Sequence, residues 1–303
     1  MSVASQRQAA PRRRELGAAS AGSLLLTVLG EFVLPAGEPV WTSALIRLLG
    51  ELDVEEKAAR QALMRTADAG WIAATREGRR TRWSLTAAGQ RLLTEGTRRI
   101  FGFAGAMDAA ERWDGQWVLL VVGGAPEGGR AVRARLRTRL RWAGFGSLPS
   151  GVWISQRLER EEEAHRVLAE LGLAAAAYSF LARPGALGSA RELVQIAWDL
   201  DDVEQHYEDF LDLIGLLRPK TDLQTLVCQV RLVQEWRRFP LLDPGLPREL
   251  LPPQWSGIRA AETFRERHAR WEPAARAGWA ALAGGSTSIE LPAGADSAAT
   301  LEP

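Results

Sequence analysis

The sequence predicts an α+β protein in three parts: an N-terminal domain of helices and one hairpin, a central domain of alternating strands and helices, and a helical C-terminal domain. Three observations predict this division. The N-terminal third reads helix, helix, helix, hairpin, helix; residues 116–182 alternate between apolar strands and amphipathic helices; and residues from 189 onward carry long helical patterns. We expect the domains to span 16–103, 104–187 and 188–284, with flexible tails at 1–15 and 285–303.

Composition indicates a folded protein of two or three domains. The chain has 303 residues, of which 46% are hydrophobic, and it contains twelve tryptophans. Its single cysteine, Cys228, excludes an intrachain disulfide and any cysteine-rich metal site, and fits a reducing compartment. The basic residues at 12–14 and the apolar stretch after them mimic an export signal, but no small-x-small cleavage pattern follows. No apolar run approaches the roughly 20 residues of a membrane span.

The N-terminal domain is predicted from helix signals and one strand pair. Helices are expected over 20–34 and 41–49, and a third helix should begin at Asp53, where Glu56 would complete a capping box. Gly70 is expected to end the third helix. The sequence WIAATREGRRTRWSLT then alternates as two short strands around a Glu-Gly turn, and Thr86 should cap a further helix to about Phe101. This order is the winged helix-turn-helix pattern.

Charge separates along the chain although the formal net charge is only +1. Residues 57–99 contain ten Lys and Arg residues against three acidic ones, whereas residues 155–217 contain five arginines against thirteen acidic residues. A basic N-terminal segment joined to a more acidic later segment predicts that the N-terminal segment binds a polyanion. The alternative is a solvated basic hairpin on a module that binds proteins.

In the third helix the small and apolar residues Ala59, Ala62, Leu63 and Thr66 share one face, and polar residues occupy the other. A winged helix places its third helix in the DNA major groove. We therefore expect Arg60, Gln61 and Arg65 to read bases, each good bidentate contact being worth about 1–3 kcal/mol, and the hairpin arginines to contact phosphates. The predicted DNA-binding residues are Lys57, Arg60, Gln61, Met64, Arg65, Arg79, Arg80 and Arg82.

The central domain should have the ferredoxin-like order βαββαβ. Strands are predicted at 116–122, at 150–155 and in AAAAYSFLA, helices in GRAVRARLRTRLRWAGFG and EREEEAHRVLAELG, and a short pairing strand near 145–148. The arginine face of the helix at 130–142 is either solvated, paired with acidic surface, or a secondary DNA contact.

The C-terminal part contains the most specific stretch, VQEWRRFPLLDPGLPRELLP. With LLLTVLGEFVLPAGEPVWTSALIRLLGELDVEEKAARQALMRTADAGWI, YSF and WDLDDVEQHYEDFL, it makes residues 20–283 resemble the PaaX-type repressors, the regulators of phenylacetic acid degradation operons. The recognition helix of that family maps onto KAARQALMRTADAGW. Met64 stands where a small polar residue is common and Thr66 where a leucine is common, so the operator and the ligand can differ.

The resemblance implies a cytoplasmic, homodimeric transcriptional repressor that binds double-stranded operator DNA. It also implies a central domain similar to the small CRISPR-associated endoribonucleases, and release from DNA by an aryl-CoA thioester, typically phenylacetyl-CoA. The two winged helices of a dimer would then match two operator half-sites, and the effector would change the spacing between the two winged helices. The rival interpretation is a scaffold that does not bind DNA, or a nucleic-acid-processing subunit built on the ferredoxin-like domain.

Residues that could form an effector pocket are found near the C-terminus. Arginine suits the phosphates of coenzyme A, and tryptophan suits an aryl ring or adenine. The alternative is that these side chains only anchor a long loop on the rest of the protein and bind no ligand. The predicted effector-binding residues are Trp236, Arg237, Arg238, Trp255 and Arg259.

No enzyme activity, metal or cofactor is predicted. Endoribonucleases of the central domain's shape need an aspartate at the end of the first strand, where this chain has valines and glycines at 121–124. Asp202 and His206 are four residues apart on a helix, but no third metal ligand is visible, and a helix N-terminus explains the acidic cluster as well. Cys228 lies in an apolar stripe and is expected to be buried.

Overall fold

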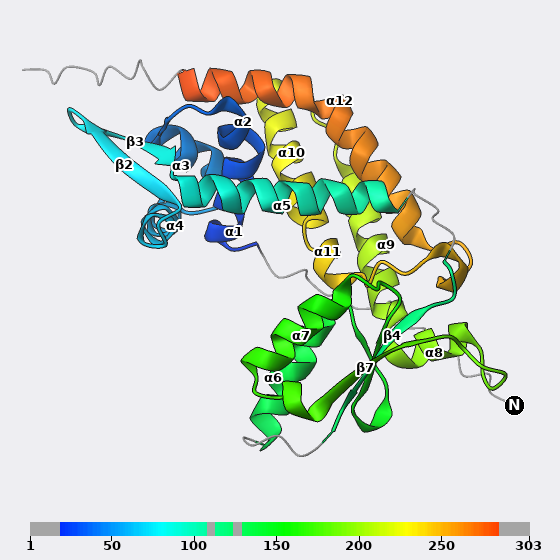
Figure 1. Cartoon of the computed structure of the whole chain (residues 1–303). Coiled ribbons are helices and arrows are strands. Elements are labelled where there is room, and N and C mark those ends of the chain that lie inside the picture. The colour runs from blue at the N-terminus through cyan, green and yellow to red at the C-terminus, as the bar shows by residue number, and fades with distance from the viewer. Residues whose placement is uncertain (1–18, 108–112, 124–128, 285–303) are drawn as a thin grey trace, which may run out of the picture.

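The computed structural model describes residues 19–107, 113–123 and 129–284, which form three packed parts (Figure 1). The tails predicted at 1–15 and 285–303 lie outside the described residues. Within the described ranges, no helix is both long and apolar enough to cross a bilayer.

The N-terminal module has the predicted order of three helices, a hairpin and a long helix. Its first helix runs through α1 (Ala21–Val28), one π turn (Leu29–Val33) and α2 (Leu34–Ala36). The remaining elements are β1 (Val40–Trp41), α3 (Thr42–Glu51), α4 (Glu56–Asp68), β2 (Ile72–Glu77), β3 (Arg80–Leu85) and α5 (Ala87–Ala106). The three strands form an antiparallel sheet in the order β1-β3-β2.

The two predicted caps of this module have different outcomes. Thr86 caps α5 as predicted, because its hydroxyl accepts the amide of Gly89 at 3.1 Å. The prediction of a capping box at Asp53 is wrong. Helix α4 begins after Glu55, and the side chain of Glu55 makes no capping hydrogen bond. Asp53 instead takes a positive φ of 64° in the turn between α3 and α4, a backbone conformation that aspartate tolerates better than most residues.

The central domain has the predicted order βαββαβ. Its elements are β4 (Trp117–Val122), α6 (Gly129–Trp142), β5 (Gly146–Ser147), β6 (Val152–Ser155), α7 (Arg160–Glu170) and β7 (Ala177–Ala182), with short 3₁₀ turns at Pro149–Gly151 and Ala174–Ala176. The sheet order is β5-β6-β4-β7 and every pair is antiparallel. Both helices pack on one face of this sheet, where Leu140 of α6 and Leu168 of α7 meet Val118 and Leu120 of β4.

The C-terminal part is helical, as predicted. It consists of α8 (Ala190–Ala197), α9 (Leu200–Leu216), α10 (Asp222–Trp236), α11 (Phe239–Leu242), a 3₁₀ turn (Arg248–Leu250) and α12 (Ser256–Gly284). Asp199 caps α9 by accepting the amide of Asp202, which agrees with the explanation of the acidic cluster as a helix N-terminus. Pro273 lies inside α12, and Figure 1 shows the axis of this helix bending along its length.

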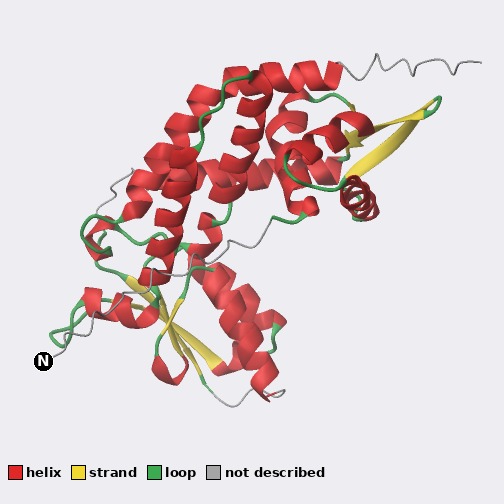
Figure 2. Cartoon of the chain, turned by 180° about the vertical axis from the view of Figure 1, so that it is seen from behind, coloured by secondary structure: helices red, strands yellow, loops and turns green. Residues whose placement is uncertain are grey.

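The hydrophobic core of the N-terminal module is completed by the C-terminal helices. Leu226 and Val230 of α10 and Ala275, Trp279 and Leu282 of α12 are buried in the same cluster as the apolar residues of α1, α3 and α4. The rings of Trp279 and Phe32 are stacked with centroids 5.7 Å apart. Both views show α10 and α12 lying against the N-terminal module (Figures 1 and 2).

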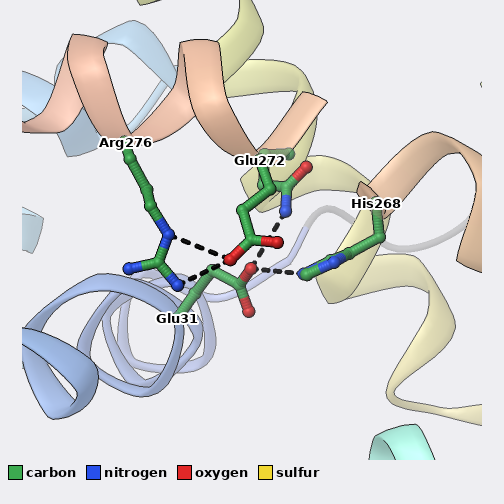
Figure 3. Close-up of polar contacts among 5 residues, drawn as sticks. Glu31, His268, Glu272 and Arg276 are labelled. Carbon is green, nitrogen blue, oxygen red and sulfur yellow. Dashed lines mark hydrogen bonds and ion pairs between the residues drawn. The ribbon is translucent and has the colours of Figure 1, made fainter. Parts of the chain in front are cut away.

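Polar side chains bind the same two parts together at the π turn. The side chain of Glu31 is nearly buried, and its Oε1 lies 2.5 Å from Nε2 of His268 on α12 (Figure 3). Gln229 of α10 donates its side-chain amide to the same oxygen at 3.0 Å. Figure 3 also shows the neighbouring pair in which Arg276 contacts Glu272 on α12. The carboxylate of Glu31 is therefore held from two C-terminal helices at once.

A second polar contact joins α1 to α10. The hydroxyl of Thr27 donates to Gln234 at 2.7 Å, and Gln234 donates to the hydroxyl of Ser23 at 2.8 Å. The guanidinium of Arg237 donates to the carbonyl of Ser23 at 3.1 Å and to Thr27 at 3.0 Å. Burial lowers the pKa of Arg237 from its ordinary value. We use the term junction for the shared core, the contacts of Glu31, and these contacts between α1 and the C-terminal end of α10.

The junction predicts a large effect of Trp279→Ala on stability. Deleting a buried tryptophan removes apolar contacts and leaves a cavity, so the free energy of unfolding should fall by about 3–5 kcal/mol. Urea denaturation measures this change. Trp142→Ala is the matched control because that indole is 62% exposed, and it should change the free energy by about 0.5 kcal/mol or less. Equal losses in the two variants would contradict the shared core.

Candidate nucleic-acid interface

Helix α4 presents one buried face and one open polar face. Ala59, Ala62, Leu63 and Thr66 are buried as predicted, and the Thr66 hydroxyl donates to the carbonyl of Ala62 at 2.7 Å. The opposite face lines an open concave surface with the side chains of Glu56, Lys57, Arg60, Gln61, Met64 and Arg65. These include all five residues that the sequence predicted on this helix.

Two of the cations on this face are held by neighbours one turn away. Arg60 donates Nε to Glu56 at 2.8 Å, and its Nη2 lies 2.7 Å from the same carboxylate oxygen. Arg65 donates to the side-chain oxygen of Gln61 at 3.4 Å. Both pairs are exposed to solvent, so a phosphate or a guanine edge can compete for these guanidinium groups at low cost. Met64 is 54% exposed and offers an apolar surface of the kind that contacts a thymine methyl group.

The β2–β3 hairpin projects from the module beside α4 (Figures 1 and 2), and its arginines are residues 76, 79, 80 and 82. Glu77 pairs with Arg80 in the sheet, which leaves Gly78 and Arg79 as a two-residue turn. Gly78 has a positive φ of 60°, which a glycine adopts without strain. The side chains of Arg79 and Arg80 are exposed. Arg76 is exposed as well and donates Nε to the carbonyl of Gly78 at 3.2 Å.

Arg82 has a different environment from the other hairpin arginines. Its guanidinium lies 4.1 Å from the ring centroid of Trp41, and its Nη1 is 3.3 Å from the carboxylate of Glu77. The guanidinium of Arg80 lies 5.6 Å from the same ring. Arg82 therefore holds the middle of the hairpin against Trp41 of β1, and the exposed Arg79 and Arg80 lie closer to the tip.

The hairpin is anchored to α3 by one threonine. The indole of Trp83 donates to the hydroxyl of Thr42 at 2.8 Å, and that hydroxyl donates to the carbonyl of Thr81 at 3.0 Å. Trp41 and Thr42 were not singled out from the sequence. An apolar residue next to a threonine gives no local signal of a contact some 40 positions away, and the register of β1 on β3 creates it.

The five predicted effector residues do not line a single pocket. Trp236 is fully buried, its indole donates to the carbonyl of Ile100 at 3.2 Å, and its ring stacks on Phe264 at 4.8 Å. Arg237 belongs to the junction. Arg238 pairs with Glu235 at 3.1 Å and contacts Nδ1 of His206 at 3.2 Å.

Trp255 and Arg259, in contrast, line a separate groove at the start of α12. Trp255 is buried and lies edge-on to Tyr207, with ring centroids 5.8 Å apart. Arg259 is exposed. Of the five predicted residues, only Trp255 and Arg259 therefore line the same groove.

The structure also places the acidic cluster with His206, the single cysteine and the arginine face of α6. Nε2 of His206 lies 3.7 Å from Asp202, and among the described residues no group of three or more His, Cys, Asp or Glu side chains is placed to hold a metal ion. Cys228 is buried as predicted, and burial raises the pKa of its thiol. On α6, Arg139 forms an ion pair with Glu170, so part of that arginine face is paired with acidic surface.

Three family models together match most of the chain. The model of the PaaX-like protein matches residues 20–89, that of the PaaX protein central Cas2-like domain matches 110–194, and that of the PaaX-like protein C-terminal domain matches 198–281. The transcriptional repressor PaaX of Escherichia coli (strain K12) is 33% identical over 288 residues, which cover 90% of this chain and 87% of that protein. The uncharacterized protein Rv0674 from Mycobacterium tuberculosis has a similar fold, with a TM-score of 0.57 and 24% identity over 86% of this chain and 98% of that one.

The geometry of the hairpin predicts that Arg79 and Arg80 supply affinity that does not depend on DNA sequence. Changing both to alanine should weaken binding to every duplex by a similar factor and make the slope of log K against log salt shallower by about two. Fluorescence anisotropy at several salt concentrations measures both quantities. Arg98→Ala, an exposed arginine on α5, is the control. An unchanged slope in the double variant would contradict this role.

The outward face of α4 predicts a different response for Gln61. Gln61→Ala should weaken binding to the preferred sequence by roughly 5- to 150-fold, corresponding to about 1–3 kcal/mol, and leave binding to unrelated duplexes almost unchanged. Competition between the preferred duplex and an unrelated duplex measures the ratio of the two affinities. A loss that is equal on both sequences would mean that Gln61 does not read bases.

Proposed function

Because the chain belongs to the PaaX-like family, we propose that it is a DNA-binding transcriptional repressor whose N-terminal module is a winged helix-turn-helix domain. In this proposal α4 enters the major groove and the β2–β3 hairpin lies along the sugar-phosphate backbone. The observation that carries the proposal is that α4 and the β2–β3 hairpin lie next to each other at one end of the molecule (Figures 1 and 2). Helix α4 has an open face with Lys57, Arg60 and Arg65, and the hairpin has exposed arginines.

The finer parts of the proposal follow the family. The repressor works in the cytoplasm as a homodimer, its operator lies at an operon for the degradation of phenylacetate or a related aromatic acid, and an aryl-CoA thioester such as phenylacetyl-CoA releases it. Two copies present two α4 helices to two half-sites, and the effector favours an arrangement whose spacing does not match them. A scaffold or a nucleic-acid-processing subunit is the second candidate, and no described feature of the central domain favours it over repression.

The junction gives a physical reason why an effector bound elsewhere can change DNA binding. The N-terminal module shares its core with α10 and α12, so it cannot turn relative to these helices without breaking buried contacts. A shift of α12 therefore moves α4 and the hairpin with it. Coupling between two such sites is typically worth about 1–3 kcal/mol, or roughly 5- to 150-fold in affinity.

The test is binding of the full chain to DNA from upstream of its own gene. A labelled fragment and a shuffled fragment of equal length are compared by anisotropy at several salt concentrations, with and without phenylacetyl-CoA. We expect preference for the native fragment, a steep decrease in affinity with salt, and a further decrease of roughly 5-fold or more on adding the thioester. Free phenylacetate and coenzyme A are the controls.

Two results would contradict different parts of the proposal. Equal, salt-insensitive affinity for both fragments would exclude a sequence-specific repressor. Specific binding that phenylacetyl-CoA and other aryl-CoA thioesters leave unchanged would retain the repressor and exclude this class of effector.

A further inference from the structure

A groove of about 680 Å³ lies where α8, the segment 248–255 and the first turns of α12 meet. Its charged walls are formed by Arg191 of α8, Arg248 of the 3₁₀ turn and Arg259 of α12. Pro252, Pro253 and Ile258 supply apolar surface, and the rest of the lining consists of Leu251, Gln254, Trp255, Ser256 and Glu262. The sequence prediction did not include Arg191 or Arg248; Arg191 lies far from Arg259 along the chain, and Arg248 has no aromatic residue next to it.

The walls of this groove are held in place before any ligand binds. Arg191 donates Nε to the carbonyl of Glu249 at 3.0 Å, which ties α8 to the segment 248–255. The amide of Ser256 donates to the carboxylate oxygens of Glu204 at 3.1 and 3.2 Å, which fixes the start of α12 on α9. Gln254 adopts a positive φ of 64°, a strained conformation for a residue other than glycine, and such strain concentrates at ligand clamps and other functional sites.

The charge of the groove is not neutralised by the protein. In the part of the chain that the structure describes, Arg191, Arg248 and Arg259 form no ion pair, whereas Arg139, Arg160 and Arg231 elsewhere each contact a carboxylate. One acidic side chain, Glu262, lines the groove beside the three arginines. Three guanidinium groups around one concave surface favour an anion, and their planar forks of donors match phosphate oxygens.

We propose that this groove binds the phosphate groups of a small organic anion and, resting on the proposed function, that the anion is the effector, a CoA thioester. The arginines take the phosphates, and the apolar surface of Pro252, Pro253 and Ile258 receives a ring of the ligand. This site replaces the sequence-predicted cluster: it keeps Trp255 and Arg259, and it adds Arg191 and Arg248.

The position of the groove connects it to the DNA-binding module through one helix. Figures 1 and 2 place the start of α12 and α8 on the opposite side of the molecule from α4 and the hairpin. The 29 residues of α12 span about 40 Å at 1.5 Å per residue. His268 of this helix contacts Glu31, and further along the same helix Trp279 and Leu282 are buried in the N-terminal core. A ligand that binds the first turns of α12 thus contacts the helix that ends inside the junction.

The experiment is calorimetric titration of the full chain with phenylacetyl-CoA, with coenzyme A and with free phenylacetate. We expect the two CoA compounds to bind and phenylacetate alone to bind at least about tenfold more weakly. Arg191→Ala combined with Arg248→Ala should raise the Kd of phenylacetyl-CoA by at least about tenfold, because two charge-assisted hydrogen-bond partners are lost. Affinity for DNA without ligand should not change.

Two further variants separate ligand binding from folding. Arg191 also holds the segment 248–255, so Arg259→Gln, at an exposed side chain of α12, tests the groove without removing that contact and should weaken phenylacetyl-CoA binding severalfold. Arg270→Ala, at another exposed arginine of the same helix outside the groove, is the matched control and should bind the thioester like the unmodified chain.

Three results would overturn the proposal. Unchanged thioester affinity in the double variant and in Arg259→Gln would exclude the groove while leaving the repressor proposal intact. Absence of binding by either CoA compound to the unmodified chain would exclude the ligand class, whatever the protein does with DNA. A loss of DNA affinity in the double variant without ligand would make the groove a contact for DNA phosphates instead.

Discussion

The structure depends on a hydrophobic core that the N-terminal module cannot complete alone. Phe32 stacks on Trp279, and Leu226 and Val230 fill the space beside α1, so the module and the C-terminal helices bury the same apolar surface. Burial of this kind is the main favourable term in folding. Domains joined by small polar interfaces move freely relative to each other, but here separation would expose a core. The DNA-binding surface therefore has its orientation set by helices more than 150 residues later in the chain.

The polar contacts around this core give the junction a defined geometry. An apolar contact is non-directional, whereas the carboxylate of Glu31 must meet His268 and the amide of Gln229 at fixed distances. The π turn that carries Glu31 widens the helix by one residue, a feature that occurs frequently at functional sites. Because α12 contributes both to this junction and to the arginine groove, one helix connects the proposed effector site to the proposed DNA surface. The same fold thus combines a rigid support for α4 with a route by which ligand binding can alter it.

Local patterns were sufficient to predict the helices and the surface of α4, and insufficient where partners come from distant parts of the chain. Periodicity alone identified Ala59, Ala62, Leu63 and Thr66 as the buried face, because burial on a helix repeats every three to four residues. The cap at Asp53 failed because a tight turn required a left-handed residue there. Trp236 and Arg237 were assigned to a ligand pocket because aromatic and basic residues suit one, but their partners, Ile100 and Ser23, lie 136 and 214 residues away. Sequence composition does not distinguish an arginine held in a junction from one in an open groove.

The central claim is that α1, α10 and α12 form one cooperative unit, and native-state hydrogen exchange tests it most directly. Amide exchange is measured along these helices at increasing, sub-denaturing concentrations of urea. If the core is shared, the most protected amides of α1 and of α10 will open with the same free energy and the same dependence on urea. The claim would be contradicted if the amides of α1 exchanged through an opening of clearly lower free energy while α10 and α12 stayed protected.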